Sequence, residues 1–90
     1  MEDEALTLAD VADIIMVEFS KSMGGLVEAS PYIEKAYRGA GLNLYHPTKE
    51  QLERAIHNLA DIEKELFGEA TAEKNRKARL EMLARIDPIQ

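Results

Sequence analysis

The stretch from Thr48 to Phe67 constrains the fold more than any other part of this sequence. Its apolar residues recur at spacings of three and four, which places them along one side of an α-helix. They are Leu52, Ala55, Leu59, Ile62 and Leu66. Thr48 and Gln51 have the spacing of a capping box, and Gly68 is the residue type that most readily ends a helix. This stretch therefore predicts a long amphipathic helix.

A second helical pattern, between residues 8 and 26, has a wider apolar arc. Thr7 and Asp10 resemble a capping box at its start. Ile14 and Val17 lie outside the main stripe, so this helix must be covered on more than one side. The run from Ile14 to Val17 alone also fits a buried strand, but the stripe is much longer than a typical strand and favours a helix. The stripe consists of Leu8, Val11, Ala12, Ile15, Phe19, Met23 and Leu26.

Glycine and proline divide the middle of the chain. The Gly24-Gly25 pair predicts a break or a bend in the first helix. Ser30 and Pro31 are typical of a helix start, so we expect a short second helix that ends at Gly39. After it, residues 42–45 alternate like a strand that has no partner. We expect an extended linker there, with its leucines filling the core.

The remaining signals complete the expected fold. Thr71 is suited to cap a last helix, and Pro88 is suited to stop it. Together the patterns predict an all-α fold, a small irregular bundle of about four helices with a short second helix. A chain of 90 residues is too short for two independent cores, so residues 1–90 should form one domain. Residues 1–6 are expected to be a frayed tail.

The charge of the chain is unevenly distributed. The net charge is −6, and residues 1–30 carry seven acids and only one lysine. Such an acidic balance argues against broad binding to nucleic-acid phosphates. The absence of cysteine excludes disulfides and thiolate metal sites. The acidic start and the lack of a long apolar run favour a cytoplasmic protein without a signal peptide or a membrane span.

One polar stripe on the long helix has the spacing of metal ligands. Glu53, His57 and Asp61 are four residues apart and could share one side of a helix. They lie opposite the leucine stripe, however, so we expect a solvated face that holds no metal. The sequence shows no catalytic residues paired for chemistry and no cofactor motif. We therefore expect neither an enzyme nor a small-molecule binder.

Four basic residues in the last helix support the alternative function, a nucleic-acid-associated regulatory protein. They are Lys74, Arg76, Lys77 and Arg79. Four bases within six residues are typical of a segment that contacts phosphates. On a helix, however, they would spread around most of the circumference. Their positive charge also suits contact with the acidic first third of the chain, within one molecule or between two.

The favoured function is protein–protein association, as a homodimer or as an adaptor subunit of a larger assembly. The wide apolar arc of the first helix carries this expectation, because a small bundle has few elements available to cover it. The predicted interface residues are Val11, Ile14, Ile15, Val17 and Phe19.

Overall fold

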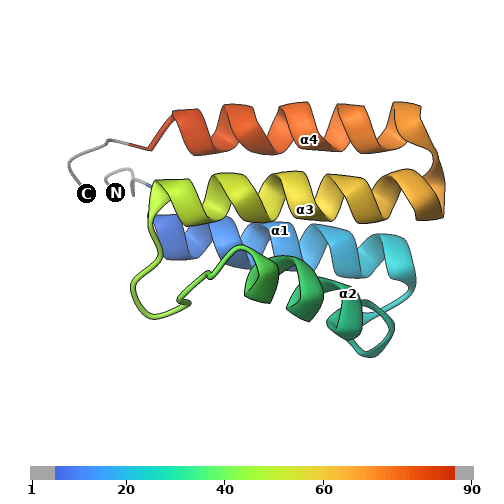
Figure 1. Ribbon diagram of the computed structural model, residues 1–90, viewed down its shortest axis with the longest axis horizontal. Helices are drawn as coiled ribbons and strands as arrows, with labels where there is room; N and C mark the ends of the chain where they lie inside the picture. The colour runs from blue at the N-terminus through green and yellow to red at the C-terminus, as the bar shows by residue number, and fades with distance from the viewer. Residues whose placement is uncertain (1–5, 87–90) are drawn as a thin grey trace, which may run out of the picture.

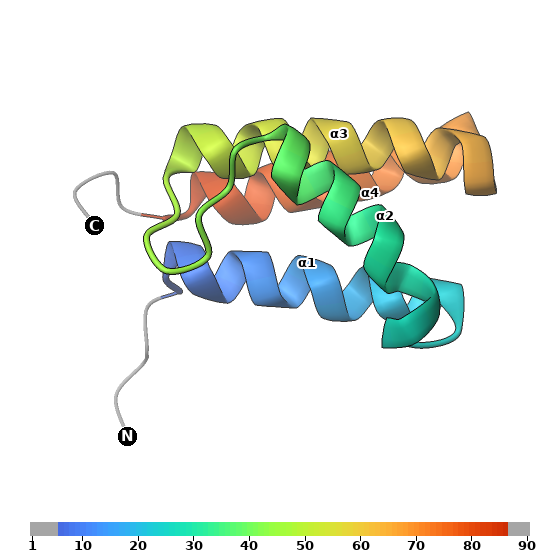
Figure 2. The same cartoon turned by 60° about the horizontal axis from the view of Figure 1, so that its bottom comes forward.

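The computed structural model describes residues 6–86, and this part of the chain is an all-α bundle without strands. Its helices are α1 (Leu8–Met23), α2 (Leu26–Gly39), α3 (Lys49–Phe67) and α4 (Glu69–Ala84). Figure 1 shows α3 between α4 on one side and α1 with α2 on the other. Figure 2 shows α2 crossing α1 and α3 obliquely, while the other helices follow the long axis. The predicted fold class is therefore confirmed.

Both predicted capping boxes are present. The backbone amide of Asp10 donates to Thr7 Oγ1 and that of Thr7 to Asp10 Oδ2, each at 3.0 Å. The amides of Gln51 and Thr48 make the same exchange at 3.1 Å. These bonds satisfy amides that have no partner within the helix, and they fix the starts of α1 and α3.

The break between α1 and α2 is confirmed, but α2 begins earlier than predicted. Gly24 and Gly25 have φ of 93° and 146°, and Gly25 N–H donates to the Ser20 carbonyl at 2.9 Å. The chain reverses within these two residues, so α2 starts at Leu26 and Pro31 lies inside it. Residues 27 and 31 are both exposed, so the proline, which cannot donate to the Val27 carbonyl, lies on the solvent side of the helix.

The start of α4 also differs from the prediction. Gly68 alone separates α3 from α4, and α4 begins at Glu69 instead of after a Thr71 cap. Gly68 has φ 98° and ψ 162°, a conformation essentially restricted to glycine. Its N–H donates to the Lys64 carbonyl and its own carbonyl accepts from Ala72, each at 3.1 Å. One residue therefore ends α3 and starts α4.

One apolar core joins all four helices. Its fully or nearly fully buried members include Val11, Ile15, Phe19, Ala29, Ile33, Leu52, Ile56, Leu59 and Leu83. Tyr37 is buried as well, and its hydroxyl donates to the Ala12 carbonyl at 2.7 Å, which ties α2 to α1. In the linker, Leu42 packs against the core as expected, whereas Leu44 is half exposed.

Within residues 6–86, no helix combines the length and the hydrophobicity that crossing a bilayer requires.

Candidate protein interface

Five large apolar side chains remain exposed at one end of the bundle. Val27 is 83% exposed, Leu26 57% and Val17 53%, and Leu66 and Phe67 follow with smaller fractions. They come from the second half of α1, the first turn of α2 and the last turn of α3, which all lie toward that end (Figures 1 and 2). We call these five residues the apolar end surface. A concentration of exposed apolar side chains at one end of a small protein makes that end a candidate interaction site.

Aromatic packing holds part of this surface in place. The fully buried Phe19 ring meets the Tyr32 ring edge-on at 6.3 Å between centroids, and the Phe67 ring at 6.5 Å. Phe19 therefore anchors the last turn of α3 and the middle of α2 to the same point of α1. The Phe67 ring, which is partly exposed, is therefore held in position by its contact with the buried Phe19 ring.

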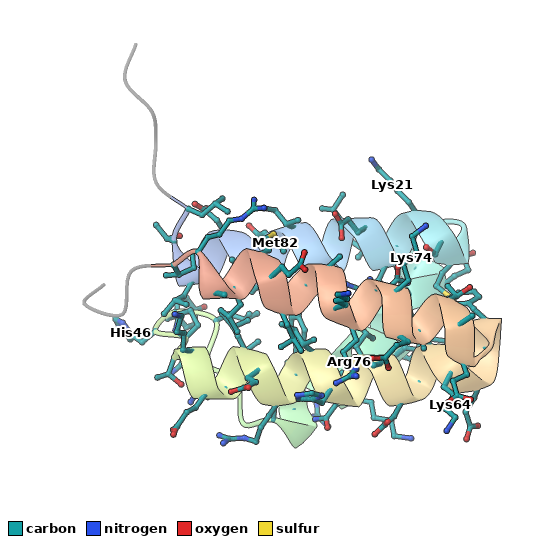
Figure 3. The ribbon with its side chains drawn as sticks, turned by 90° about the horizontal axis from the view of Figure 1, so that it is seen from above. Lys21, His46, Lys64, Lys74, Arg76 and Met82 are labelled. Carbon is teal, nitrogen blue, oxygen red and sulfur yellow. The ribbon has the colours of Figure 1, made fainter. Side chains whose placement is uncertain are left out.

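A hollow of about 500 Å³ lies between the end of α1 and the start of α2. Gly24 is part of its lining, and an added Cβ there would meet no atom within 4 Å. Its rim carries Lys21, which Figure 3 shows extended away from the body of the protein. The hollow is lined by Met16, Val17, Ser20, Lys21, Gly24, Gly25 and Leu26. It is therefore an apolar depression, with a cation at its edge, beside the most exposed residues of the apolar end surface.

A second depression of about 690 Å³ runs between α2 and α3. Tyr32 and Leu66 lie along it, so it adjoins the apolar end surface. The Asn58 side chain donates to the Ala36 carbonyl at 3.1 Å and ties the two helices together. Lys35 on α2 and two acids on α3, Asp61 and Glu65, make its lining more polar than that of the α1–α2 hollow. It is therefore a groove of mixed apolar and charged character.

The structure corrects the predicted interface. Val11, Ile15 and Phe19 are at most 1% exposed and belong to the core of the chain itself, because the other helices cover the main stripe of α1. Ile14 is half-buried and Val17 is exposed, so of the five predicted interface residues only these two reach the surface.

The remaining members of the apolar end surface were missed as interface residues. Leu26 extends the periodicity of α1, and Leu66 that of α3, so the sequence suggests that both are inward-facing. The break at residues 24–25 starts a new helix in another direction and thereby leaves Leu26 and Val27 largely exposed.

The basic segment of α4 is divided between the core and the surface. Arg79 is 4% exposed, and its Nη1 donates to Glu63 Oε1 at 2.8 Å. Arg76 pairs with Glu73 on the same helix. Lys74 and Lys77 are exposed. Figure 3 shows Lys74 and Arg76 on opposite sides of α4, so the segment does not form one cationic face.

Sequence reasoning also missed the buried Glu63. This residue is fully buried, and its second oxygen accepts from Asn75 Nδ2 at 3.1 Å. A signal was available, because Glu63 follows Ile56 by seven residues and Leu59 by four, and both are core residues. An acid at that spacing on an apolar stripe indicates a buried partner, which here is Arg79.

The polar stripe of α3 is exposed at all three positions, Glu53, His57 and Asp61. Among residues 6–86, no three His, Cys, Asp or Glu side chains are arranged to hold a metal ion.

Comparison of the chain with protein-family models, with curated proteins and with solved structures finds no match. Function is therefore inferred from the surface itself.

Proposed function

We propose that this protein acts by binding another protein chain through the apolar end surface, and that it is not an enzyme. The observation that carries the proposal is the exposure of Val27 and Leu26, at 83% and 57%, beside the apolar hollow between α1 and α2. Covering such side chains removes apolar area from water, at about 25 cal/mol per Å². Phe67 belongs to this surface and Tyr32 lines the adjoining groove, and aromatic residues are enriched in protein interfaces.

The alternative of nucleic-acid binding receives less support. Arg79 is committed to a buried ion pair and Arg76 to a neighbouring acid, which leaves Lys74 and Lys77 as the exposed bases of the segment. Two lysines on a protein of net charge −6 provide little phosphate neutralisation.

A cytoplasmic location is part of the proposal, and cell fractionation tests it.

The proposal is tested with two matched surface variants. Val27→Glu places a charge in the apolar end surface, whereas Leu44→Glu places one on a half-exposed leucine of the α2–α3 loop, at the other end of the bundle. Tagged wild type and both variants are isolated from cells that also make the untagged chain. Every co-purifying protein, the untagged chain included, is then quantified.

We expect a stoichiometric partner with the wild type and with Leu44→Glu, and its loss with Val27→Glu. Circular dichroism should show that both variants remain folded, since an acid in the first turn of α2 suits the helix dipole. A partner that binds Val27→Glu as well as the wild type would contradict the proposal, as would the absence of any partner.

A further inference from the structure

We infer that the partner is a second copy of this chain, bound so that Val27 of each copy enters the α1–α2 hollow of the other. This inference rests on the proposed function and names the partner of that surface. It depends on two properties of the hollow and its surroundings, their shape and their charge.

The shape is self-complementary. Val27 projects from the first turn of α2 and is 83% exposed, so its own chain leaves it almost uncovered. The hollow is lined by the residue before it, Leu26, and by Gly24, where an added Cβ would meet no atom within 4 Å. Each copy therefore carries an exposed apolar side chain, Val27, next to an apolar hollow. Two such surfaces related by a two-fold axis satisfy each other and form a closed dimer.

The charges at the hollow are also self-complementary. Lys21 stands at one side of the hollow. The Glu28 carboxylate lies next to Gly25, another lining residue, since its Oε1 would be 3.0 Å from a Cβ built there. The ion pairs within residues 6–86 are Glu34–Arg38, Glu73–Arg76 and Glu63–Arg79, and neither Lys21 nor Glu28 takes part in them. A two-fold arrangement that pairs Lys21 of each copy with Glu28 of the other gives two reciprocal ion pairs.

The overall charge of the chain does not prevent this contact. Two copies of net charge −6 repel at long range, but salt screens charges more than about 8 Å apart at physiological ionic strength. At the contact itself, the positive charge of Lys21 offsets the negative charge of Glu28. Apolar burial supplies most of the affinity, and the two charges select the partner and its orientation.

The first experiment is sedimentation equilibrium of the full chain from micromolar to millimolar concentration. We expect a monomer–dimer equilibrium for the wild type and for Leu44→Glu, and at least about a tenfold weaker dimer for Val27→Glu, since a charge would enter an apolar hollow. A wild type that stays monomeric up to 1 mM would overturn the inference. The proposed function would survive that result if the Val27-dependent partner in the co-purification experiment is a different protein.

The second experiment is a charge exchange. Lys21→Glu alone and Glu28→Lys alone each turn two attractive pairs into two repulsive ones, and we expect each variant to dimerise roughly tenfold more weakly than the wild type. Mixing the two variants should restore dimerisation, because one chain then offers only acids at these positions and the other only bases. The double variant should also dimerise. Failure of the mixture to recover would refute the reciprocal contact, even if the wild type is a dimer.

Discussion

At the scale of single residues, the buried ion pair between Glu63 and Arg79 is the most consequential feature. It joins α3 to α4 at 2.8 Å, with both side chains at most 4% exposed. The Asn75 side chain donates a hydrogen bond to the second oxygen of the Glu63 carboxylate. Arg79 Nε has no hydrogen-bond partner among residues 6–86. Such a pair contributes little net stability, but loss of one member leaves a buried charge uncompensated.

Arg79→Met should therefore lower the free energy of unfolding by about 3–5 kcal/mol, because Glu63 would be left in the core without its counter-charge. Arg76→Met is the matched control, since it removes a partly exposed pair on the same helix and should cost about 1 kcal/mol or less. Combining Arg79→Met with Glu63→Leu should recover most of the loss. Urea unfolding followed by circular dichroism measures all three, and equal costs for the two arginine variants would contradict the prediction.

Tyr37 gives a prediction for alkaline pH. Burial raises the pKa of its phenol far above the usual 10, with a smaller lowering by the Arg79 charge and a further raising by Asp13. The folded chain therefore keeps this proton after the unfolded chain has lost it. The stability that results is complete below about pH 10 and is lost as the pH rises above it.

Tyr37→Phe should cost about 0.5–1.5 kcal/mol at pH 7, because the bond to the Ala12 carbonyl is lost. The difference between wild type and variant should shrink as the pH rises from 9 to 11. Urea titrations at several pH values measure it, with Tyr32→Phe as the control on a half-buried ring. A difference that stays constant with pH would show that the phenol does not titrate in this way.

At the scale of elements, the first turn of α2 is the weakly held part of the candidate interface. It follows two glycines, lacks a side-chain cap and contains Leu26 and Val27. Pro31 has no N–H to donate to the Val27 carbonyl, so this turn has one hydrogen bond fewer than an ordinary helix. The residues that offer apolar contact therefore lie on a turn with fewer stabilising hydrogen bonds than the rest of α2.

Pro31→Ala should restore the missing bond and raise the free energy of unfolding by about 1–3 kcal/mol. It should also slow amide hydrogen exchange at Ala29 and Ser30, which two-dimensional NMR measures residue by residue. Ser30→Ala is the control, since it changes helix propensity nearby without adding a hydrogen bond, and should shift stability by less than about 1 kcal/mol. Unchanged exchange in Pro31→Ala would mean that the proline does not weaken this turn.

At the scale of the whole molecule, one continuous core includes residues from every helix. Each helix buries a stripe against the others, and Gly68 joins α3 directly to α4 without a flexible linker. The chain is also small, and single domains of this size commonly unfold in an all-or-none manner.

We therefore expect one cooperative unfolding transition at low protein concentration. Far-UV circular dichroism, dominated by helix, and tyrosine fluorescence should report the same midpoint in urea, since Tyr37 lies in the shared core. Two separated midpoints would instead indicate that α4, or the first turn of α2, unfolds independently.

The sequence by itself determined the helical class, both capping boxes, the break at Gly24-Gly25 and the buried part of the α3 stripe, Leu52 to Leu59. These features are local. A capping box, a stripe at spacings of three and four and a glycine pair depend on residues within a few turns of one another, so neighbours in the chain suffice to define them.

Only the tertiary structure decided which apolar residues are covered. Val11 and Val27 look alike in sequence, yet one is fully buried and the other 83% exposed, because covering depends on where distant helices lie. The same holds for Arg79, which resembles its exposed neighbour Lys77 but lies beside a buried acid sixteen residues earlier in the chain. Burial and charge pairing are properties of the assembled helices, and for that reason the candidate interface emerged only from the fold.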